Sequence, residues 1–298
     1  MAPKKRKQAQ KTVANTTEKT KKKKQQPKKA VGEGGQHEET VSLTSSSSDD
    51  GPLLNSDTEE EGGDAHETID VDFECCDPGE DDFHSIKMLL THYLDGRQYA
   101  SSELVEAIID AQASSVIKCG DGEEAIGVAA VLPCTPHSPA PYEKELVKFI
   151  LDSSKGGDDV KKGKKLVGLW EKPGSALLVS ERLMNCPPQL APPLLESLIE
   201  ECSGSDIKRL VFLTRAYEDV KEKELIFATP EGEFLAAHAE VSFDFPVANR
   251  TVVAGGSGSG GDKGNGGDLV PKRVAMVVNM GVLESGAVVR EMQACLNT

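Results

Sequence analysis

Aromatic residues and long apolar runs are scarce in this chain of 298 residues. Phe, Tyr and Trp together make up 4% of it, and there is a single Trp. The longest apolar runs, such as AIGVAAVL at 125–132, are far shorter than the ~20 residues that a membrane-spanning helix needs. No apolar segment follows the basic residues at the start, as it would in a secretory signal. We therefore expect a soluble intracellular protein without a membrane span.

Paired cysteines and catalytic motifs are missing as well. The seven cysteines are odd in number, scattered and without a C-x-x-C pair, which argues against a disulfide framework and a zinc site. There is no Walker A motif, G-x-S-x-G elbow or H-E-x-x-H pair. A formal G-x-G-x-x-G at Gly256, Gly258 and Gly261 lies among too many helix breakers to open a phosphate-binding helix. We predict no catalytic residue, no cofactor and no metal.

Two long segments at the start of the chain carry charges of almost one sign only, the first with almost no acidic residues and the second with no basic ones. Residues 1–30 hold twelve Lys/Arg and one Glu, whereas residues 31–82 hold eighteen Asp/Glu and no Lys/Arg. Segments so polar cannot bury enough apolar surface to offset the entropy of ordering. We predict a disordered tail at 1–68, basic over 1–30 and acidic over 31–68, followed by a folded domain at 69–298. The acidic excess of that domain argues against specific nucleic-acid binding.

The basic start resembles a signal read by nuclear import receptors. Its first cluster is PKKRK, with Lys4, Lys5, Arg6 and Lys7, and KKKK follows at 21–24. A solvated tail with no reader is the alternative. The cluster predicts an import receptor as partner and a nuclear location, with shuttling to the cytoplasm left open.

The acidic part of the tail contains hydroxyl residues that precede acidic ones, as acid-directed kinases prefer. Phosphorylation would add about −1.5 to −2 charges at each site to a segment that is already negative. An unmodified solubilising spacer is the alternative. The candidate sites are Ser46, Ser47, Ser48, Ser56 and Thr58.

Strand and helix patterns alternate from Ile69 to the C-terminus, which predicts an α/β fold in a single domain with a mixed sheet. Apolar residues alternate with acidic ones at 69–75, and a helix with an Asp82 cap follows. Leu194, Leu195, Leu198 and Ile199 share one face of a later helix. The segment KGGDDVKKGKK at 155–165 reads as a polar loop, and residues 255–267 as a flexible Gly-rich insert.

Three groups of polar or aromatic residues receive structural interpretations. Ser180, Glu181 and Arg182 bring together a hydroxyl, an acid and a base, but no histidine stands nearby, so an ion pair or a strand-end cap is favoured over catalysis. His84 and His92, placed on the first helix, point about 80° apart and do not form a ligand pair. Trp170 is expected to pack in the core or at its edge.

Several segments together resemble the BCCIP family of eukaryotic nuclear proteins. They are VDFECCDPGEDDFHSIKMLL, SSVIK, ALLVSERLMNCPPQLAPPLLESLIEE, FATPEGEFLAAHAEVSFDFPV and KRVAMVVNMGVLESGAVVREM. The resemblance implies a fold similar to GNAT acetyltransferases without their acetyl-CoA motif. The sequence agrees with that, since it has no R/Q-x-x-G-x-G/A turn.

The resemblance also implies a function. Members of the family escort a basic ribosomal protein of the large subunit, and act in ribosome biogenesis and nuclear export. We therefore expect a non-catalytic chaperone with such a protein as its partner. An adaptor for cell-cycle or DNA-repair proteins, binding a recombination mediator or a kinase inhibitor, is the alternative, and a cryptic acetyltransferase is the least favoured.

Overall fold

The structure, a computed structural model, describes residues 8–10, 71–120, 123–155, 157–247 and 269–297. All of these belong to one compact unit. The basic cluster Lys4–Lys7, the hydroxyl residues of the acidic tail and the Gly-rich insert lie outside the described residues. The same is true of Gly256, Gly258 and Gly261.

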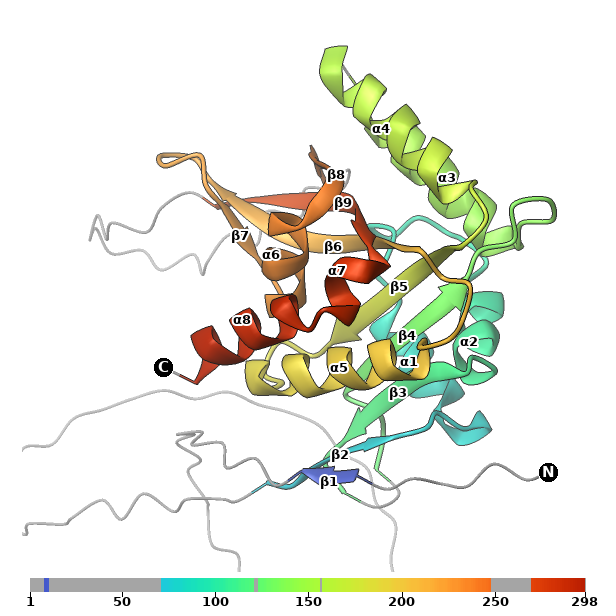
Figure 1. The fold of residues 1–298 in the computed structure, drawn as a ribbon, viewed down its shortest axis with the longest axis vertical. Coiled ribbons are helices and arrows are strands. Elements are labelled where there is room, and N and C mark those ends of the chain that lie inside the picture. Colours follow the sequence, from blue (N-terminus) through green and yellow to red (C-terminus); the bar gives the residue numbers. More distant parts are fainter. Residues whose placement is uncertain (1–7, 11–70, 121–122, 156, 248–268, 298) are drawn as a thin grey trace, which may run out of the picture. The chain divides into compact units, whose positions relative to one another are not determined.

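One mixed sheet organises the described part of the chain, and its order is β1-β2-β3-β4-β5-β6-β9-β8, with β7 paired to β6 (Figure 1). Every pair in it is antiparallel except β5 with β6. This confirms the predicted α/β fold with a mixed sheet. The strands are β1 Gln8–Gln10, β2 Phe73–Cys76, β3 Ala113–Lys118, β4 Gly127–Pro133, β5 Ser175–Arg182, β6 Arg209–Asp219, β7 Leu225–Phe227, β8 Ala239–Pro246 and β9 Leu269–Asn279.

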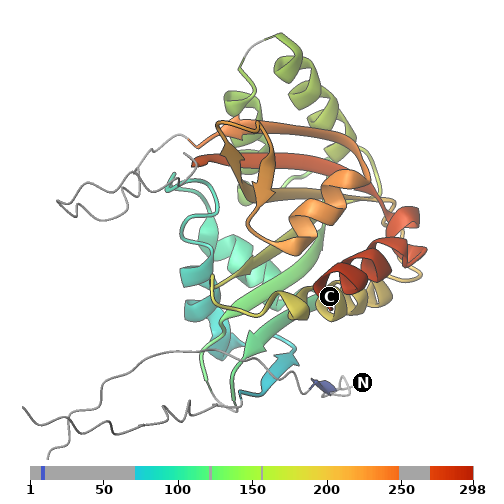
Figure 2. The same cartoon turned by 90° about the vertical axis from the view of Figure 1, so that its left-hand side faces the viewer.

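Helices cover both faces of this sheet. They are α1 Phe83–Leu89, α2 Ser101–Ile109, α3 Pro141–Ser153, α4 Gly157–Trp170, α5 Ala191–Glu201, α6 Pro230–Ala237, α7 Met280–Glu284 and α8 Ala287–Leu296, with short 3-10 turns at Glu80–Asp82 and Pro188–Leu190. The first four helices pack in one apolar core and the last four in another. Figure 2 shows α1 and α2 on one side of the strands and α5 and α8 on the other.

Burial on both faces explains the uninterrupted apolar runs of the central strands. In β4, Val128 and Ala130 belong to the first core, whereas Ala129 and Val131 belong to the second. Side chains of a strand point alternately to opposite faces, so both sets must be apolar when both faces are covered. No helix of the described residues is long and apolar enough to cross a membrane.

The predicted loop at 155–165 is wrong, because α4 begins at Gly157 and runs to Trp170. Gly163, Leu166, Val167 and Trp170 are its buried positions, at the spacing of one helical face. Lysines and glycines between them concealed this pattern. Trp170 itself is 3% exposed, as its predicted place in the core requires.

Of two expectations about the first helix, one holds in part and one is wrong. Asp82 stands at the N-cap position of α1, as predicted, but its side chain makes no capping bond; it accepts from the Gly79 amide at 3.0 Å and pairs with Lys118 at 2.6 Å. The helix ends at Leu89, so His92 lies in the turns after it. Tertiary pairing with a neighbouring strand outweighed the local cap.

Strands β5 and β6 separate after a short parallel ladder. Pairing covers Ser175–Leu178 with Arg209–Phe212, after which β5 continues beside β4 and β6 continues beside β9. Beyond that point β5 has no partner on the β6 side, whereas β6 pairs with β7 from Ala216 to Glu218. Polar side chains of β5 and β6 face each other across the split.

Candidate functional site

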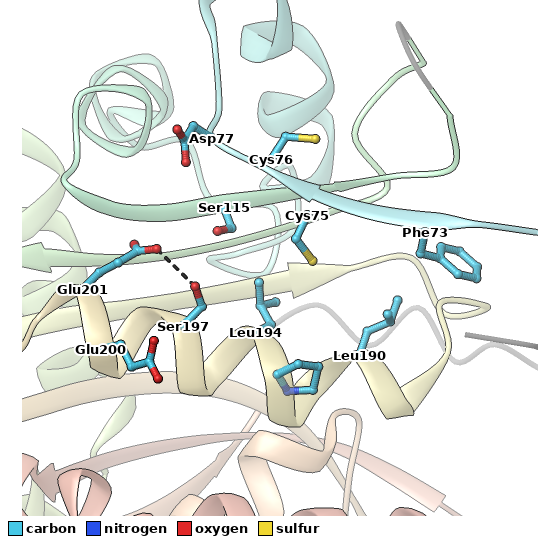
Figure 3. A pocket seen from close by; sticks show the side chains of 11 residues that line it. Phe73, Cys75, Cys76, Asp77, Ser115, Leu190, Leu194, Ser197, Glu200 and Glu201 are labelled. Carbon is cyan, nitrogen blue, oxygen red and sulfur yellow. Dashed lines mark hydrogen bonds between the residues drawn. The ribbon is translucent and has the colours of Figure 1, made fainter. Parts of the chain in front are cut away.

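A groove lies between the edge of the sheet and helix α5, with a volume of about 290 Å³. Strand β2 and Ser115 of β3 form one wall, and residues from Leu190 to Glu201 form the other (Figure 3). Pro192 and Pro193 lie in the first turn of α5. Backbone N–H groups there have no partner within the helix, so the N–H that proline lacks costs no helical hydrogen bond. The buried face of α5 is Leu194, Leu195 and Leu198, as predicted, while Ile199 is half-buried.

One half of the groove is apolar. Phe73, Leu190 and Leu194 line it, and Figure 3 shows the Cys75 side chain pointing toward α5 while that of Cys76 points away. Burial, then Cys76 and Cys186, raise the pKa of the Cys75 thiol to about 11. The thiol is therefore protonated at neutral pH, and it contributes apolar surface rather than a nucleophile.

The other half is acidic, with Asp77, which directly follows β2, and Glu200 and Glu201 from the last turn of α5. A helix C-terminus already carries partial negative charge, and cations are the side chains that stabilise it. This last turn contains no basic residue. The negative potential at this end of the groove is consequently stronger than the three carboxylates alone would make it.

Glu201 is half-buried, whereas Asp77 and Glu200 are exposed. Its Oε1 accepts from the Ser197 hydroxyl at 3.1 Å, but its Oε2 is buried without a hydrogen-bond partner of good geometry in the described part of the chain. Burial raises the pKa of this carboxyl, and Asp77 and Glu200 add to the effect, while the Ser197 hydroxyl and the Ser114 backbone oppose it. A donor or cation bound in the groove would satisfy that oxygen.

Strand β2 offers backbone groups beside these side chains. One of its edges pairs with β3, and the other pairs with β1 in the register Gln8↔Cys75, Ala9↔Glu74 and Gln10↔Phe73. Because β1 covers only three residues, an extended segment that replaced it could pair with the N–H and C=O groups of β2 whatever its side chains. Groove and edge together form a surface for an extended, positively charged segment.

The polar residues between β5 and β6 serve a different purpose. Ser180 donates to Glu231 of α6 at 2.9 Å, Arg182 pairs with the same carboxylate, and Glu181 pairs with Arg215 of β6. Burial raises the pKa of Glu181, against the opposing effect of Arg215 and Arg273. The predicted structural ion pair is confirmed: these groups hold the two diverging strands to each other and to α6.

A second hollow of about 290 Å³ adjoins this split, and Arg215, Lys272 and Arg273 lie along it. Each of these cations already has an acidic partner. Arg273 binds Asp95 at 2.7 Å, and Lys272 binds Asp244 at 2.9 Å. Since the charges are neutralised inside the protein, this hollow offers an anion little attraction. Among the described residues, no three His, Cys, Asp or Glu side chains are grouped so that they could hold a metal ion.

None of the three acidic groove residues was singled out from the sequence. Glu200 and Glu201 carried one signal, a helix ending in two glutamates with no lysine or arginine in its last turn. Asp77 is more than 120 positions away in the chain, and no pattern linked it to them. The import and phosphorylation candidates remain predictions, because they lie outside the described residues.

This is an α/β protein with an open mixed sheet and an acidic groove at one end of that sheet. The model of the BCCIP family matches residues 68–235, more than half of the chain. The chain belongs to the BCCIP family, which confirms the resemblance seen in the sequence.

Individual relatives agree with this. A "Protein BCCIP homolog" of Arabidopsis thaliana is 29% identical over 231 residues, covering 67% of this chain and 69% of that protein. A "Protein bcp1" of Aspergillus oryzae is 26% identical over 183 residues, covering 58% of this chain and 62% of that protein. The crystal structure of BCP1 from Saccharomyces cerevisiae aligns with a TM-score of 0.52 at 21% identity, covering 80% of this chain and 94% of that one.

Acetyltransferases are also among the solved structures that align with the chain. An agmatine N-acetyltransferase aligns with a TM-score of 0.39 at 8% identity, covering 70% of this chain and 99% of that one. At that distance the likeness says nothing about chemistry.

Proposed function

We propose that this chain is a non-catalytic interaction protein that escorts a basic ribosomal protein of the large subunit, and that its acidic groove holds an extended cationic segment of that client. The observation that carries the proposal is the acidic end of the groove, which Asp77, Glu200 and Glu201 line and where the last turn of α5 contains no basic residue. Unassembled ribosomal proteins are strongly basic, and an escort must mask their charge.

Three physical features support a cationic segment as the occupant. The carboxylates of Asp77, Glu200 and Glu201 converge on one end of the groove, and the α5 C-terminus adds to their field. The apolar half can take aliphatic side chains or the stems of Lys and Arg. The β2 edge supplies backbone pairing that does not depend on the client's sequence.

The proposal of a non-catalytic role rests on where the reactive side chains are. Ser180 donates a hydrogen bond to Glu231, and Glu231 and Glu181 form ion pairs with Arg182 and Arg215, so that these groups join β5, β6 and α6. The thiol of Cys75 is kept protonated by burial. Each of these groups has a structural task, which favours binding over chemistry.

The remaining parts of the proposal concern the tail. Lys4–Lys7 would be read by a nuclear import receptor, and the protein would act in ribosome biogenesis and nuclear export. The acidic tract would raise the rate of encounter with a basic client, and phosphorylation of Ser46–Ser48 would strengthen that effect.

The test compares two variants of the full-length protein with equal loss of charge. In the groove variant, Asp77→Asn, Glu200→Gln and Glu201→Gln are combined. In the control variant, Glu103→Gln, Glu106→Gln and Asp110→Asn are combined; these side chains are exposed at α2, on the opposite face of the sheet. Each protein is used to capture partners from nuclear extract, and the captured proteins are identified by mass spectrometry.

We expect wild type and control to retain a basic large-subunit ribosomal protein, and the groove variant to lose most of it. Purified client should then bind the groove variant at least ~10-fold more weakly, the effect of about 1.4 kcal/mol, in titrations at fixed salt. Equal loss in both variants would show that only net charge matters. Retention by the groove variant would place the client elsewhere on the protein.

A further inference from the structure

The outer edge of β2 is already paired with a piece of the same chain. Strand β1 is formed by Gln8–Gln10, and it lies antiparallel to β2 over three residue pairs (Figure 1). We propose that this edge is a docking site for the chain's own N-terminal segment, and that docking there competes with recognition of the basic cluster Lys4–Lys7 by an import receptor.

The pairing is of the kind that can be exchanged. Three residue pairs make a short ladder, and isolated two-stranded pairing of that length is marginal in water. Strand β2 is held on its other side by β3 and packs Phe73 in the second core, so it stays in place when β1 leaves. The edge is thus a fixed template with a replaceable partner.

The acidic residues in and beside β2 favour a basic segment as its pairing partner. Lys4–Lys7 directly precede β1 in the sequence, and Lys11 directly follows it. On the β2 side, Glu74 stands opposite Ala9, and Asp77 follows the strand at the acidic end of the groove. In the β1–β2 register, Gln8 stands at the Cys75 end of the ladder, which is the end nearer Asp77. The basic cluster is joined to β1 through Gln8, so it is attached at the end of the ladder nearer that carboxylate.

The functional consequence is a coupling between two binding events. An import receptor needs Lys4–Lys7 on an accessible, extended chain, whereas docking holds the residues beside them against β2. Anything that displaces β1 makes the cluster more accessible, and by linkage a receptor bound to the cluster frees the β2 edge. Resting on the proposed function, a client segment in the groove would be one such competitor, so that the loaded protein would be imported better than the empty one.

The first experiment tests the pairing itself in the full-length protein. Gln8 is directly opposite Cys75, and the Cα atoms of directly opposed residues in an antiparallel pair are about 4.5–5.5 Å apart, within the range that a disulfide spans. Gln8→Cys is therefore expected to form a disulfide with Cys75 under mild oxidation, detected by peptide mapping with mass spectrometry. The same substitution combined with Cys75→Ser, and Thr20→Cys outside β1, are the matched controls.

The second experiment tests the competition. Gln8→Pro combined with Ala9→Pro must remove at least one ladder hydrogen bond, because successive N–H groups of a strand point to alternate edges. Val13→Pro with Ala14→Pro is the control, which adds the same number of prolines outside β1. We expect a purified import receptor to bind the first variant ~3- to 10-fold more tightly than wild type or control, the effect of about one or two hydrogen bonds.

Each result bears on the proposal separately from the escort function. Cross-linking of position 8 to Cys75 no greater than that of position 20 would overturn the docking. Receptor affinity unchanged by the two prolines would overturn the competition. Neither result would affect client capture through Asp77, Glu200 and Glu201, so failure of this inference and failure of the escort function are distinguishable.

Discussion

The Glu231 carboxylate lies between Ser180 and Arg182 and is 3% exposed, so the ion pair with Arg182 is removed from water. A buried pair adds little net stability compared with an apolar pair, but breaking it leaves a charge without a partner. Removing Glu231 would therefore leave the Arg182 charge buried without this partner.

We expect Glu231→Ala to lower the free energy of unfolding by ~3 to 5 kcal/mol, because Arg182 would keep its charge in the interior. Replacing both partners, with Arg182→Met and Glu231→Leu, should cost much less, since neither charge remains. Urea unfolding of the two variants measures this. A double variant as unstable as the single one would mean that the pair contributes through shape and not through charge.

Glu201 should make stability depend on pH. Because burial raises the pKa of its carboxyl, the folded state holds this proton more tightly than the unfolded state does. The contribution to stability is fully present below the unfolded pKa of about 4.3, and it is lost as pH rises through the higher folded value.

The Glu201→Gln variant has no carboxyl at this position, so it does not lose stability through that ionisation as pH rises. Its stability relative to wild type should increase between about pH 4 and pH 7, and at pH 7 it should equal or exceed wild type by up to ~1 kcal/mol, the scale of an interaction of a partly exposed charge. Thermal unfolding at several pH values measures the difference. Glu196→Gln on the same helix controls for the loss of a carboxylate. A difference independent of pH would show that Glu201 is compensated in the folded state.

At the scale of elements, the two glycines inside α4 have opposite surroundings. A Cβ at Gly163 would lie 2.6 Å from Ser154 Oγ, at the buried end of α3, whereas a Cβ at Gly168 would meet nothing within 4 Å. Gly163 therefore permits α3 and α4 to approach each other, and Gly168 only lowers the helix propensity.

We expect Gly168→Ala to raise the free energy of unfolding by ~0.5 to 1 kcal/mol, because Ala loses less backbone entropy in a helix. Gly163→Ala should lower it by ~1 to 3 kcal/mol through overpacking against Ser154. Ser154→Gly combined with Gly163→Ala should recover part of that loss. Denaturant midpoints of the three variants check this. Equal effects at both glycines would mean that α4 does not pack on α3 as described.

The helices and strands also show how much of the fold local sequence patterns can predict. Alternation of strand and helix predicted β3 to β9 and the helices between them, since periodic burial is recorded in neighbouring residues. The α4 segment was missed, because Gly157 and Gly163 are read as helix breakers and the lysines as a loop. Gly163 is in close contact with Ser154, and the lysines of α4 face solvent. A short stretch of sequence does not record either of these tertiary properties.

At the scale of the whole molecule, charge is arranged by segment. The domain from residue 83 onward is moderately acidic, and a far more acidic tract precedes it. Under the proposed function, the groove provides the shaped contact, while the tract raises the local concentration of a basic client around the domain.

Deleting residues 31–66 is therefore expected to slow association with the purified client, by ~10-fold or more at low salt, and to flatten the salt dependence of the association rate. Dissociation should change little, because the groove contacts remain. Stopped-flow binding at two salt concentrations measures both rates. The groove variant is the counterpart: it should mainly accelerate dissociation. An association rate that the deletion leaves unaltered would reduce the tract to a spacer.

Sequence alone determined the class of the fold, the family and the charge layout. Strands covered on both faces must be apolar at nearly every position, as β4 is, and such runs can be read without knowing what covers them. The helical face of Leu194, Leu195 and Leu198 is likewise a local property. The strand pattern and the helical face are each recorded in residues that are close together in the sequence.

Tertiary structure alone decided which distant residues became neighbours. Asp77 meets Glu200 and Glu201 because β2 is the strand beside β3 and α5 packs across β3 and β4. Glu231 meets Arg182 because β5 and β6 separate after four residue pairs and α6 lies against the split. Strand order and helix placement are set by the burial of both cores at once, a long-range balance that no local pattern contains.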